Sequence, residues 1–115
     1  PLVEGAVPDF ADFMDSIPFN VPKEKILFNV SAEEQVDVTE IKKMMAKQIA
    51  SRVRWCDIIT TMIEEGVDTF VEIGPKTVLK GMMRKIAPKG TKVTSLQLDT
   101  PESLEKCIQK IAELS

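Results

Sequence analysis

The sequence predicts an α/β fold with a largely parallel sheet flanked by helices. Three short apolar runs rich in β-forming residues alternate with stretches whose apolar residues recur at helical spacing. The sequence contains no internal repeat, low-complexity tract or linker, and 115 residues with 43% hydrophobic content suit one core. We therefore expect residues 1–115 to form a single α/β unit.

The first half should contain two helices separated by a strand. Apolar residues at helical spacing predict a helix over residues 8–17, which ends before Pro18. The run KILFNV, residues 25–30, predicts a strand covered on both faces. Asp37 and, three residues later, Glu40 have the spacing of a capping box, so the second helix should begin there.

The second half continues the alternation of helix and strand. A stripe from Trp55 to Ile63, closed by Gly66, predicts a third helix. The runs TFVEIG and KVTSLQL predict two further buried strands, and each is followed by a helical pattern, over residues 78–86 and 101–114. Strand, tight turn and helix make half of a βαβ unit, which is why the sheet should be largely parallel.

Charge and composition exclude several classes of protein. The formal net charge is -3, with lysines and acids interleaved, so a nucleic-acid partner is not expected. No apolar run approaches the roughly 20 residues that cross a bilayer, so we expect a cytoplasmic protein without a membrane partner. The sequence has no histidine and no CxxC pair, so it cannot complete a common zinc site or an imidazole-activated nucleophile. Cys56 and Cys107 are expected to be buried free thiols.

Several polar features could carry function, and each has a plainer explanation. The turn EIGPKT could hold an anion at a helix N-terminus, but it matches no phosphate-binding motif, so an ordinary connection is favoured. Glu72 within a strand needs a basic partner or an exposed sheet edge. Arg52 and Arg54 could clamp a carboxylate, although solvated arginines beside Trp55 are favoured.

Gln48 is the most informative polar residue. It lies on or beside the apolar stripe of the second predicted helix, which includes Ile41 and Met45. An unsatisfied amide in such a setting costs ~1–3 kcal/mol, so its side chain should have partners, and a structural role is the default. Asn29 is likewise expected to satisfy backbone groups at a strand end rather than touch a substrate.

Four stretches resemble, in order, the C-terminal part of bacterial malonyl-CoA:acyl carrier protein transacylases: LFNVSA, IKKMMAKQIASRVRW, MIEEGVDTFVEIGPKTVLKGMMRKI and DTPESLEK. The resemblance covers nearly the whole sequence. It implies the C-terminal part of an α/β hydrolase-like acyltransferase large subdomain whose N-terminal part is absent from this chain. In that family a serine is acylated by malonyl-CoA and passes the malonyl group to the phosphopantetheine thiol of acyl carrier protein, in fatty-acid synthesis.

The resemblance assigns a role to Gln48. This residue takes the place of the family's active-site glutamine, whose main-chain carbonyl accepts a hydrogen bond from the catalytic histidine and so orients the ring. The serine motif and the histidine precede anything in this chain, which should therefore be inactive alone. The family's carboxylate-binding arginine also belongs to that part, so neither Arg52 nor Arg54 inherits its role. Lys76 replaces the usual second glycine after Gly-Pro, which argues against a role there that needs a positive φ.

Two functions of different class follow from these observations. The favoured one is part of a malonyl transferase, with malonyl-CoA as substrate and no cofactor, and with acyl carrier protein and the missing N-terminal part as partners. The alternative is a non-catalytic α/β interaction or scaffold domain that has kept the motifs. A narrower alternative is an acyltransferase for another acyl group, as in polyketide assembly. A piece of a larger enzyme should expose an apolar sheet edge where the missing strands belong.

Overall fold

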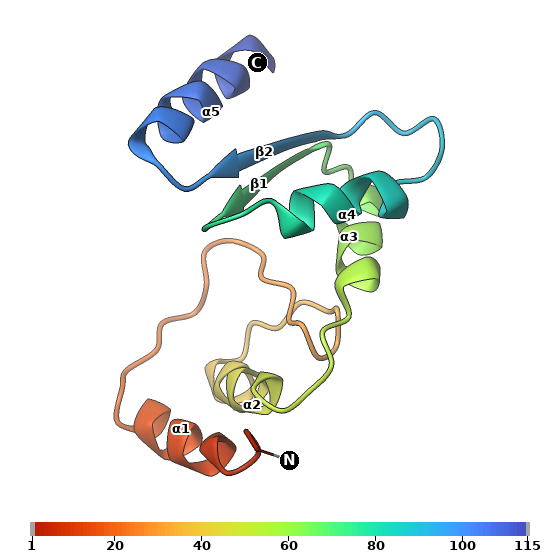
Figure 1. Cartoon of the computed structure of the whole chain (residues 1–115). Helices are drawn as coiled ribbons and strands as arrows, with labels where there is room; N and C mark the ends of the chain where they lie inside the picture. The colour runs from red at the N-terminus through yellow and green to blue at the C-terminus, as the bar shows by residue number, and fades with distance from the viewer. Residues whose placement is uncertain (1, 115) are drawn as a thin grey trace. The chain divides into compact units, whose positions relative to one another are not determined.

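The computed structural model describes residues 2–114, which divide into two compact units at residues 58 and 59 (Figure 1). The elements follow in the order α1 (Ala6–Asp15), α2 (Val38–Gln48), α3 (Trp55–Glu64), β1 (Thr69–Ile73), α4 (Val78–Ile86), β2 (Thr94–Leu98) and α5 (Pro101–Leu114). Within the described residues, no helix is both long enough and apolar enough to span a membrane. That residues 1–115 act as one α/β unit stays a prediction.

The unit from residue 59 onward is organised by a pair of parallel strands. β1 and β2 pair in parallel, from Thr69 opposite Thr94 to Ile73 opposite Leu98. The intervening helix α4 and the following helix α5 both pack against β2. Figure 1 shows α4 below and α5 above the strand pair in that view. The two strands predicted in this half of the chain, their parallel pairing and the helix after each strand are therefore confirmed.

The helix ends in this unit follow the expected local chemistry. α3 ends at Glu64, and Gly66 closes it two residues later with a φ of 95°, which glycine adopts at little cost. The N–H groups of Gly66 and Val67 donate to the carbonyls of Ile63 and Met62 at 3.0 Å, which satisfies the last turn of the helix. At the start of α5, the hydroxyl of Thr100 accepts a hydrogen bond from the N–H of Ser103.

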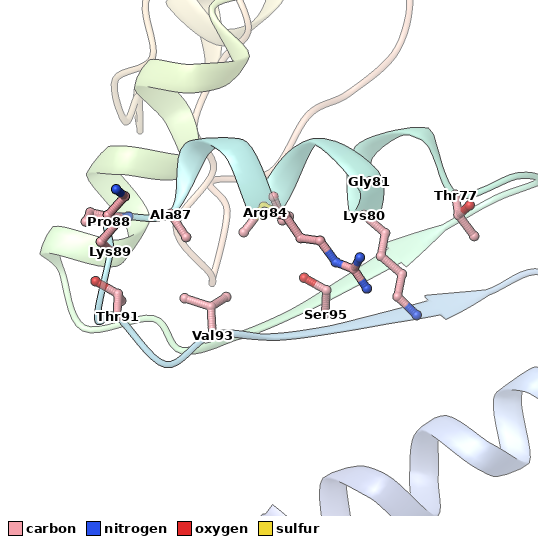
Figure 2. Close-up of a pocket in the computed structure, with 11 residues that line it drawn as sticks. Thr77, Lys80, Gly81, Arg84, Ala87, Pro88, Lys89, Thr91, Val93 and Ser95 are labelled. Carbon is pink, nitrogen blue, oxygen red and sulfur yellow. The ribbon is translucent and has the colours of Figure 1, made fainter.

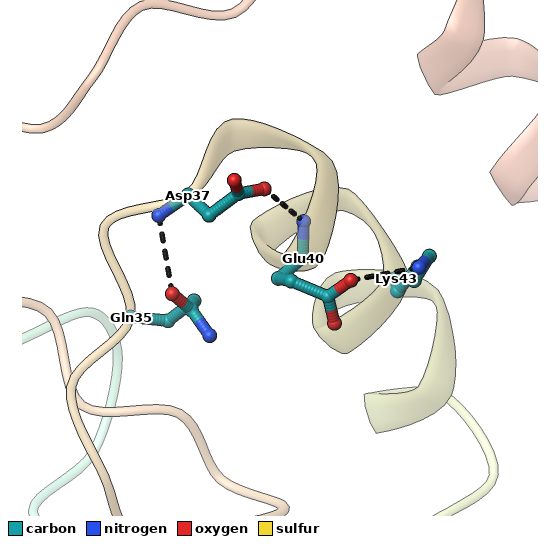
Figure 3. Close-up of polar contacts among 4 residues, drawn as sticks. All are labelled: Gln35, Asp37, Glu40 and Lys43. Atoms are coloured by element: carbon teal, nitrogen blue, oxygen red, sulfur yellow. Dashed lines mark hydrogen bonds and ion pairs between the residues drawn. The ribbon is translucent and has the colours of Figure 1, made fainter.

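The unit up to residue 58 contains α1 packed against α2. Asp37 caps α2 as predicted, because its carboxylate accepts a hydrogen bond from the N–H of Glu40 at 3.0 Å (Figure 3). The reciprocal bond of a capping box is absent. The amide oxygen of Gln35 accepts from the Asp37 N–H instead, and the Glu40 carboxylate accepts from Lys43 at 2.7 Å. This hydrogen bond, with the negative charge of Glu40, raises the pKa of Lys43.

The prediction of a strand over residues 25–30 is wrong. This segment makes one isolated antiparallel bridge, between Leu27 and Glu34, and then reverses direction. The N–H of Phe28 donates to the carbonyl of Glu33, and the N–H of Ala32 donates to the carbonyl of Phe28 at 2.8 Å. Ala32 adopts a φ of 57°, which closes the reversal. Burial is confirmed only for Phe28, since Ile26 is 42% exposed, and a tight loop rather than a ladder satisfies the backbone of the run.

The two remaining strands are less covered than predicted. Within the described residues, Ile73 at the end of β1 is 79% exposed and Val71 is 39% exposed. One face of α5 also exposes a row of aliphatic side chains at helical spacing: Leu104, Ile108, Ile111 and Leu114. Apolar surface of this kind on both a strand and a helix is typical of elements that another part of a protein covers.

Both cysteines are free, as expected. Cys107 is buried, and its thiol donates to the carbonyl of Gln97 at 3.3 Å. Cys56 is exposed, which corrects the prediction that it is buried. Cys56 lies in the first turn of α3, before the buried residues Ile58 and Ile59, so helical spacing alone did not decide its burial.

Candidate functional site

Gln48 is the last residue of α2, and its side chain has a partner. The amide oxygen accepts a hydrogen bond from the main-chain N–H of Asn29 at 2.8 Å. An amide beside an apolar stripe is thus explained, because it satisfies a part-buried N–H in the loop that replaces the predicted strand. The bond fixes the end of the helix to the loop 19 residues earlier in the sequence.

The loop is held from a second side by Arg54. The carbonyl of Asn29 accepts a hydrogen bond from the main-chain N–H of Arg54 at 2.9 Å. The guanidinium of Arg54 donates to the carbonyl of Ser31 at 3.1 Å and pairs with Asp57 at 2.9 Å. Arg54 therefore serves the chain's own backbone, and Arg52 lies exposed beside it. Asn29 was expected to satisfy backbone groups at a strand end; instead Gln48 and Arg54 satisfy the backbone N–H and C=O of Asn29, and no strand ends there.

The main-chain carbonyl of Gln48 lies where a helix leaves acceptors free. Beyond α2 the chain continues with tighter i to i+3 hydrogen bonds, from Ile49 to Ala46 and from Ala50 to Lys47, both 3.3 Å long. The Gln48 carbonyl accepts a long bond of this kind, 3.4 Å from the N–H of Ser51. A carbonyl oxygen has two lone pairs, so this group can accept a second, shorter hydrogen bond.

A mainly apolar groove of about 530 Å³ adjoins Gln48 within the same unit. Its lining comes from the loop before α2 and from one face of α2: Phe19, Asn20, Pro22, Ile26, Leu27, Phe28, Ile41, Met45 and Gln48. The lining contains no ionisable side chain, so the groove itself holds no general acid or base. Nor do the described residues include a cluster of acidic residues or cysteines that could hold a metal ion.

Glu72 finds its partner at the start of α4. Its carboxylate accepts hydrogen bonds from the N–H groups of Leu79 at 3.2 Å and Lys80 at 2.9 Å. Thr77, at the N-cap position, makes no side-chain cap bond, so Glu72 supplies the cap from the preceding strand. The helix N-terminus is thus filled by the chain's own carboxylate, which confirms that the EIGPKT turn is an ordinary connection.

The backbone conformation of Lys76 in this turn differs from the prediction, which did not expect a positive φ here. Its φ is 70°, so the backbone adopts at a lysine the left-handed conformation that glycine adopts most easily. The adjacent Gly74 also has a positive φ, of 133°. The turn geometry is therefore preserved without the second glycine, at the cost of strain in one residue.

Comparison with known proteins supports the assignment of the fold. No protein-family model matches the chain. The chain is 30% identical, over 112 residues, to a malonyl CoA-acyl carrier protein transacylase of Bacillus subtilis; the alignment covers 97% of the chain and 34% of the relative. It is 36% identical over 89 residues to the enzyme of the same name from Staphylococcus aureus strain COL, covering 77% of the chain and 29% of the relative. The chain thus spans about a third of the length of these relatives.

Solved structures agree with the sequence matches. A malonyl CoA-acyl carrier protein transacylase from Clostridium perfringens superposes with a TM-score of 0.83 and 32% identity, over 96% of this chain and 34% of that one. A malonyl-transacylase in complex with a type II PKS acyl-carrier protein gives a TM-score of 0.82 and 25% identity, over 95% and 34%.

These matches define the class first: the chain has the α/β fold of the acyltransferases that carry malonyl groups. It belongs to the malonyl CoA-acyl carrier protein transacylase family and corresponds to the C-terminal part of its members. The role predicted for the Gln48 carbonyl stays a prediction, because the histidine that it would orient is not in this chain. The sequence drew attention to Gln48, Asn29 and Arg54 separately, but not to the bonds that join them.

Proposed function

We propose that this chain forms part of a malonyl-CoA:acyl carrier protein transacylase of fatty-acid biosynthesis. The proposed enzyme transfers malonyl from CoA to a serine and then from the seryl ester to the phosphopantetheine thiol of acyl carrier protein. The serine and its histidine come from a part outside this chain, so the chain alone is inactive. The reaction needs no cofactor, since malonyl-CoA is consumed as a substrate, and we place it in the cytoplasm.

The observation that carries the proposal is the similarity to named transacylases over 97% of the chain, with Gln48 at a firmly held helix end. In the proposed enzyme the Gln48 carbonyl accepts a hydrogen bond from one ring nitrogen of the histidine. This leaves the other nitrogen free to take the serine proton. A neutral acceptor orients the ring without adding the negative charge that a carboxylate would bring near the imidazolium.

The exposed apolar surfaces support a place within a larger enzyme. Ile73 and Val71 of β1 and the aliphatic row of α5 offer apolar area that a soluble monomer rarely leaves uncovered. Burying such area contributes about 25 cal/mol for each Å² removed from water. We propose that the N-terminal part of the enzyme covers it.

A chimera tests the proposed function. Residues 1–115 would replace the matching C-terminal part of the Bacillus subtilis relative, and the product would be incubated with malonyl-CoA and then with the carrier protein. Intact mass spectrometry should show one malonyl group on the chimera and its transfer to the carrier protein. A folded chimera that never gains malonyl, beside a parent enzyme that does, would contradict the proposal. Parallel reactions with other acyl-CoA thioesters test the alternative of a different acyl group.

Gln48→Ala in the chimera tests the role of the carbonyl. Because the acceptor belongs to the backbone, this variant should lower kcat by roughly tenfold, through looser support of the helix end, whereas loss of a triad histidine costs more than ~10³-fold. A loss of kcat equal to that of the histidine variant would show that the side chain, and not the carbonyl, is the essential group.

A further inference from the structure

A basic groove lies between α4 and β2, within the unit from residue 59 onward. It has a volume of about 700 Å³, and its walls are one side of α4, the strand β2 and the loop that joins them (Figure 2). Three cations line it, Lys80 and Arg84 toward one end and Lys89 at the other. No acidic side chain lines the groove.

The side chains of the two cations of α4 extend into the same part of the groove. Lys80 and Arg84 are four residues apart, on one side of the helix, and Figure 2 shows both side chains extending toward β2, with the hydroxyl of Ser95 nearby. Among the residues that the structure describes, neither Lys80 nor Arg84 has a side-chain ion pair. Like charges at this spacing destabilise a helix, and Lys80 also lies at its positive end. The Glu72 carboxylate already meets the N–H of Lys80 at the helix end, but an anion bound between the two side chains would relieve their mutual repulsion.

Gly81 supplies a second, independent observation. It lies in the interior of α4, where glycine is less favourable than alanine. Packing does not require the glycine, because a Cβ at this position would meet no atom within 4 Å. Gly81 also lines the groove, between the two cations in sequence. Because Gly81 has no side chain, only main chain forms the groove wall at this position.

We propose that this groove binds the phosphate attached to pantetheine. A guanidinium and an ammonium that converge beside a hydroxyl are the groups that recognise phosphate oxygens. The choice of pantetheine phosphate rests on the proposed function, in which both the donor, CoA, and the acceptor, the phosphopantetheine of the carrier protein, contain it. That an anion binds at all rests on the groove alone.

Titration of the isotopically labelled chain tests the proposal by NMR. CoA and 4′-phosphopantetheine should shift the amide resonances of Lys80, Gly81, Arg84 and Ser95 at low salt, and pantetheine without phosphate should not. Equal affinity for the two phosphorylated ligands assigns the site to the phosphate that they share. Tighter binding of CoA assigns its additional phosphates to the groove as well. Equal shifts with pantetheine, or no shifts with any ligand, would overturn the proposal.

Variants of α4 separate a built site from general charge attraction. Lys80→Ala and Arg84→Ala should each weaken CoA binding by about tenfold, the effect expected for loss of one charge-assisted hydrogen bond. Lys85→Ala is the matched control, since it removes the same charge from the same helix but from a residue that does not line the groove. An equal loss with Lys85→Ala would overturn the proposal.

Gly81→Leu changes the shape of the groove without changing its charge. It should abolish binding while the helix remains folded, because leucine is a better helix former than glycine. Unchanged binding by this folded variant would also overturn the proposal. The titration and the chimera assay test the two proposals separately. If the chimera is active but the isolated chain binds no phosphate, only the proposed phosphate site is rejected. If the isolated chain binds phosphate but the chimera is inactive, only the transacylase function is rejected.

Discussion

Each of the two units is stabilised internally by a different kind of hydrogen bond. Up to residue 58, the loop that carries Asn29 is fixed by side chains distant in sequence, the amide of Gln48 and the guanidinium of Arg54. From residue 59 onward, the backbone ladder of β1 and β2 sets the framework, and Glu72 joins it to the next helix only seven and eight residues later. The first unit therefore depends on the identity of a few side chains, and the second more on the main chain.

The largest effect is expected at Glu72. Glu72→Ala removes a charged acceptor from two N–H groups of α4 and should lower the free energy of unfolding by about 2–3 kcal/mol. Denaturant unfolding measures the loss, and amide hydrogen exchange of Leu79 and Lys80 localises it. Glu72→Gln, which keeps one acceptor oxygen, should lose about half as much. If the alanine variant exchanges these amides no faster than the wild type, Glu72 does not hold the helix.

A somewhat smaller loss is expected at Gln48. Gln48→Ala leaves the part-buried N–H of Asn29 without its acceptor and should cost about 1–2 kcal/mol. Faster hydrogen exchange at the Asn29 amide is the specific readout. Lys47→Ala, at the exposed neighbouring position, should stay within about 0.5 kcal/mol of the wild type. Equal effects of the two substitutions would remove the contrast between the two units.

A gain in stability is expected at Lys76. Lys76→Gly relieves a left-handed backbone conformation that costs an L-residue ~1–2 kcal/mol, partly offset by the greater freedom of glycine when unfolded. The net increase in the free energy of unfolding should be about 0.5–1 kcal/mol. Lys76→Ala removes the charge but keeps the strain, so it should give no such increase. A gain as large with alanine would assign the effect to charge.

A loss no larger than the gain at Lys76 is expected at Arg54. Its ion pair with Asp57 is half exposed, so Arg54→Ala should cost only about 0.5–1 kcal/mol, mainly through the lost bond to the carbonyl of Ser31. Chemical denaturation of Arg54→Ala and of Arg52→Ala, an exposed neighbour, measures the difference. If Arg52→Ala costs as much, the Arg54 guanidinium contributes no specific support to the loop.

Local patterns predicted the second unit better than the first. The strands 69–73 and 94–98 of the second unit follow β-forming apolar runs bounded by turn residues. In the first unit the Asp37 cap was predictable because it depends on contacts within three residues. The run at 25–30 also contains β-forming apolar residues, yet its backbone groups bond to a local reversal and to Gln48. Nothing in the run itself encodes an acceptor 19 residues away, so periodicity could not distinguish loop from strand.

The candidate site was also predictable only where a local pattern indicated it. An amide next to an apolar stripe must find a partner, and this indicated that Gln48 matters. It did not indicate that the partner is the N–H of Asn29, nor that Gly81 and two cations of α4 share a groove. Those relations depend on which segments fold beside one another.

The placement of the two cysteines gives each unit its own chemical reporter. Cys56, exposed in the first unit, should react at once with a thiol reagent, and a probe there would lie two residues from Arg54. Cys107, buried against the carbonyl of Gln97, should react only when α5 opens away from β2. The rate of the second labelling event therefore measures how often the sheet-containing unit opens, in the unmodified chain and without an engineered label.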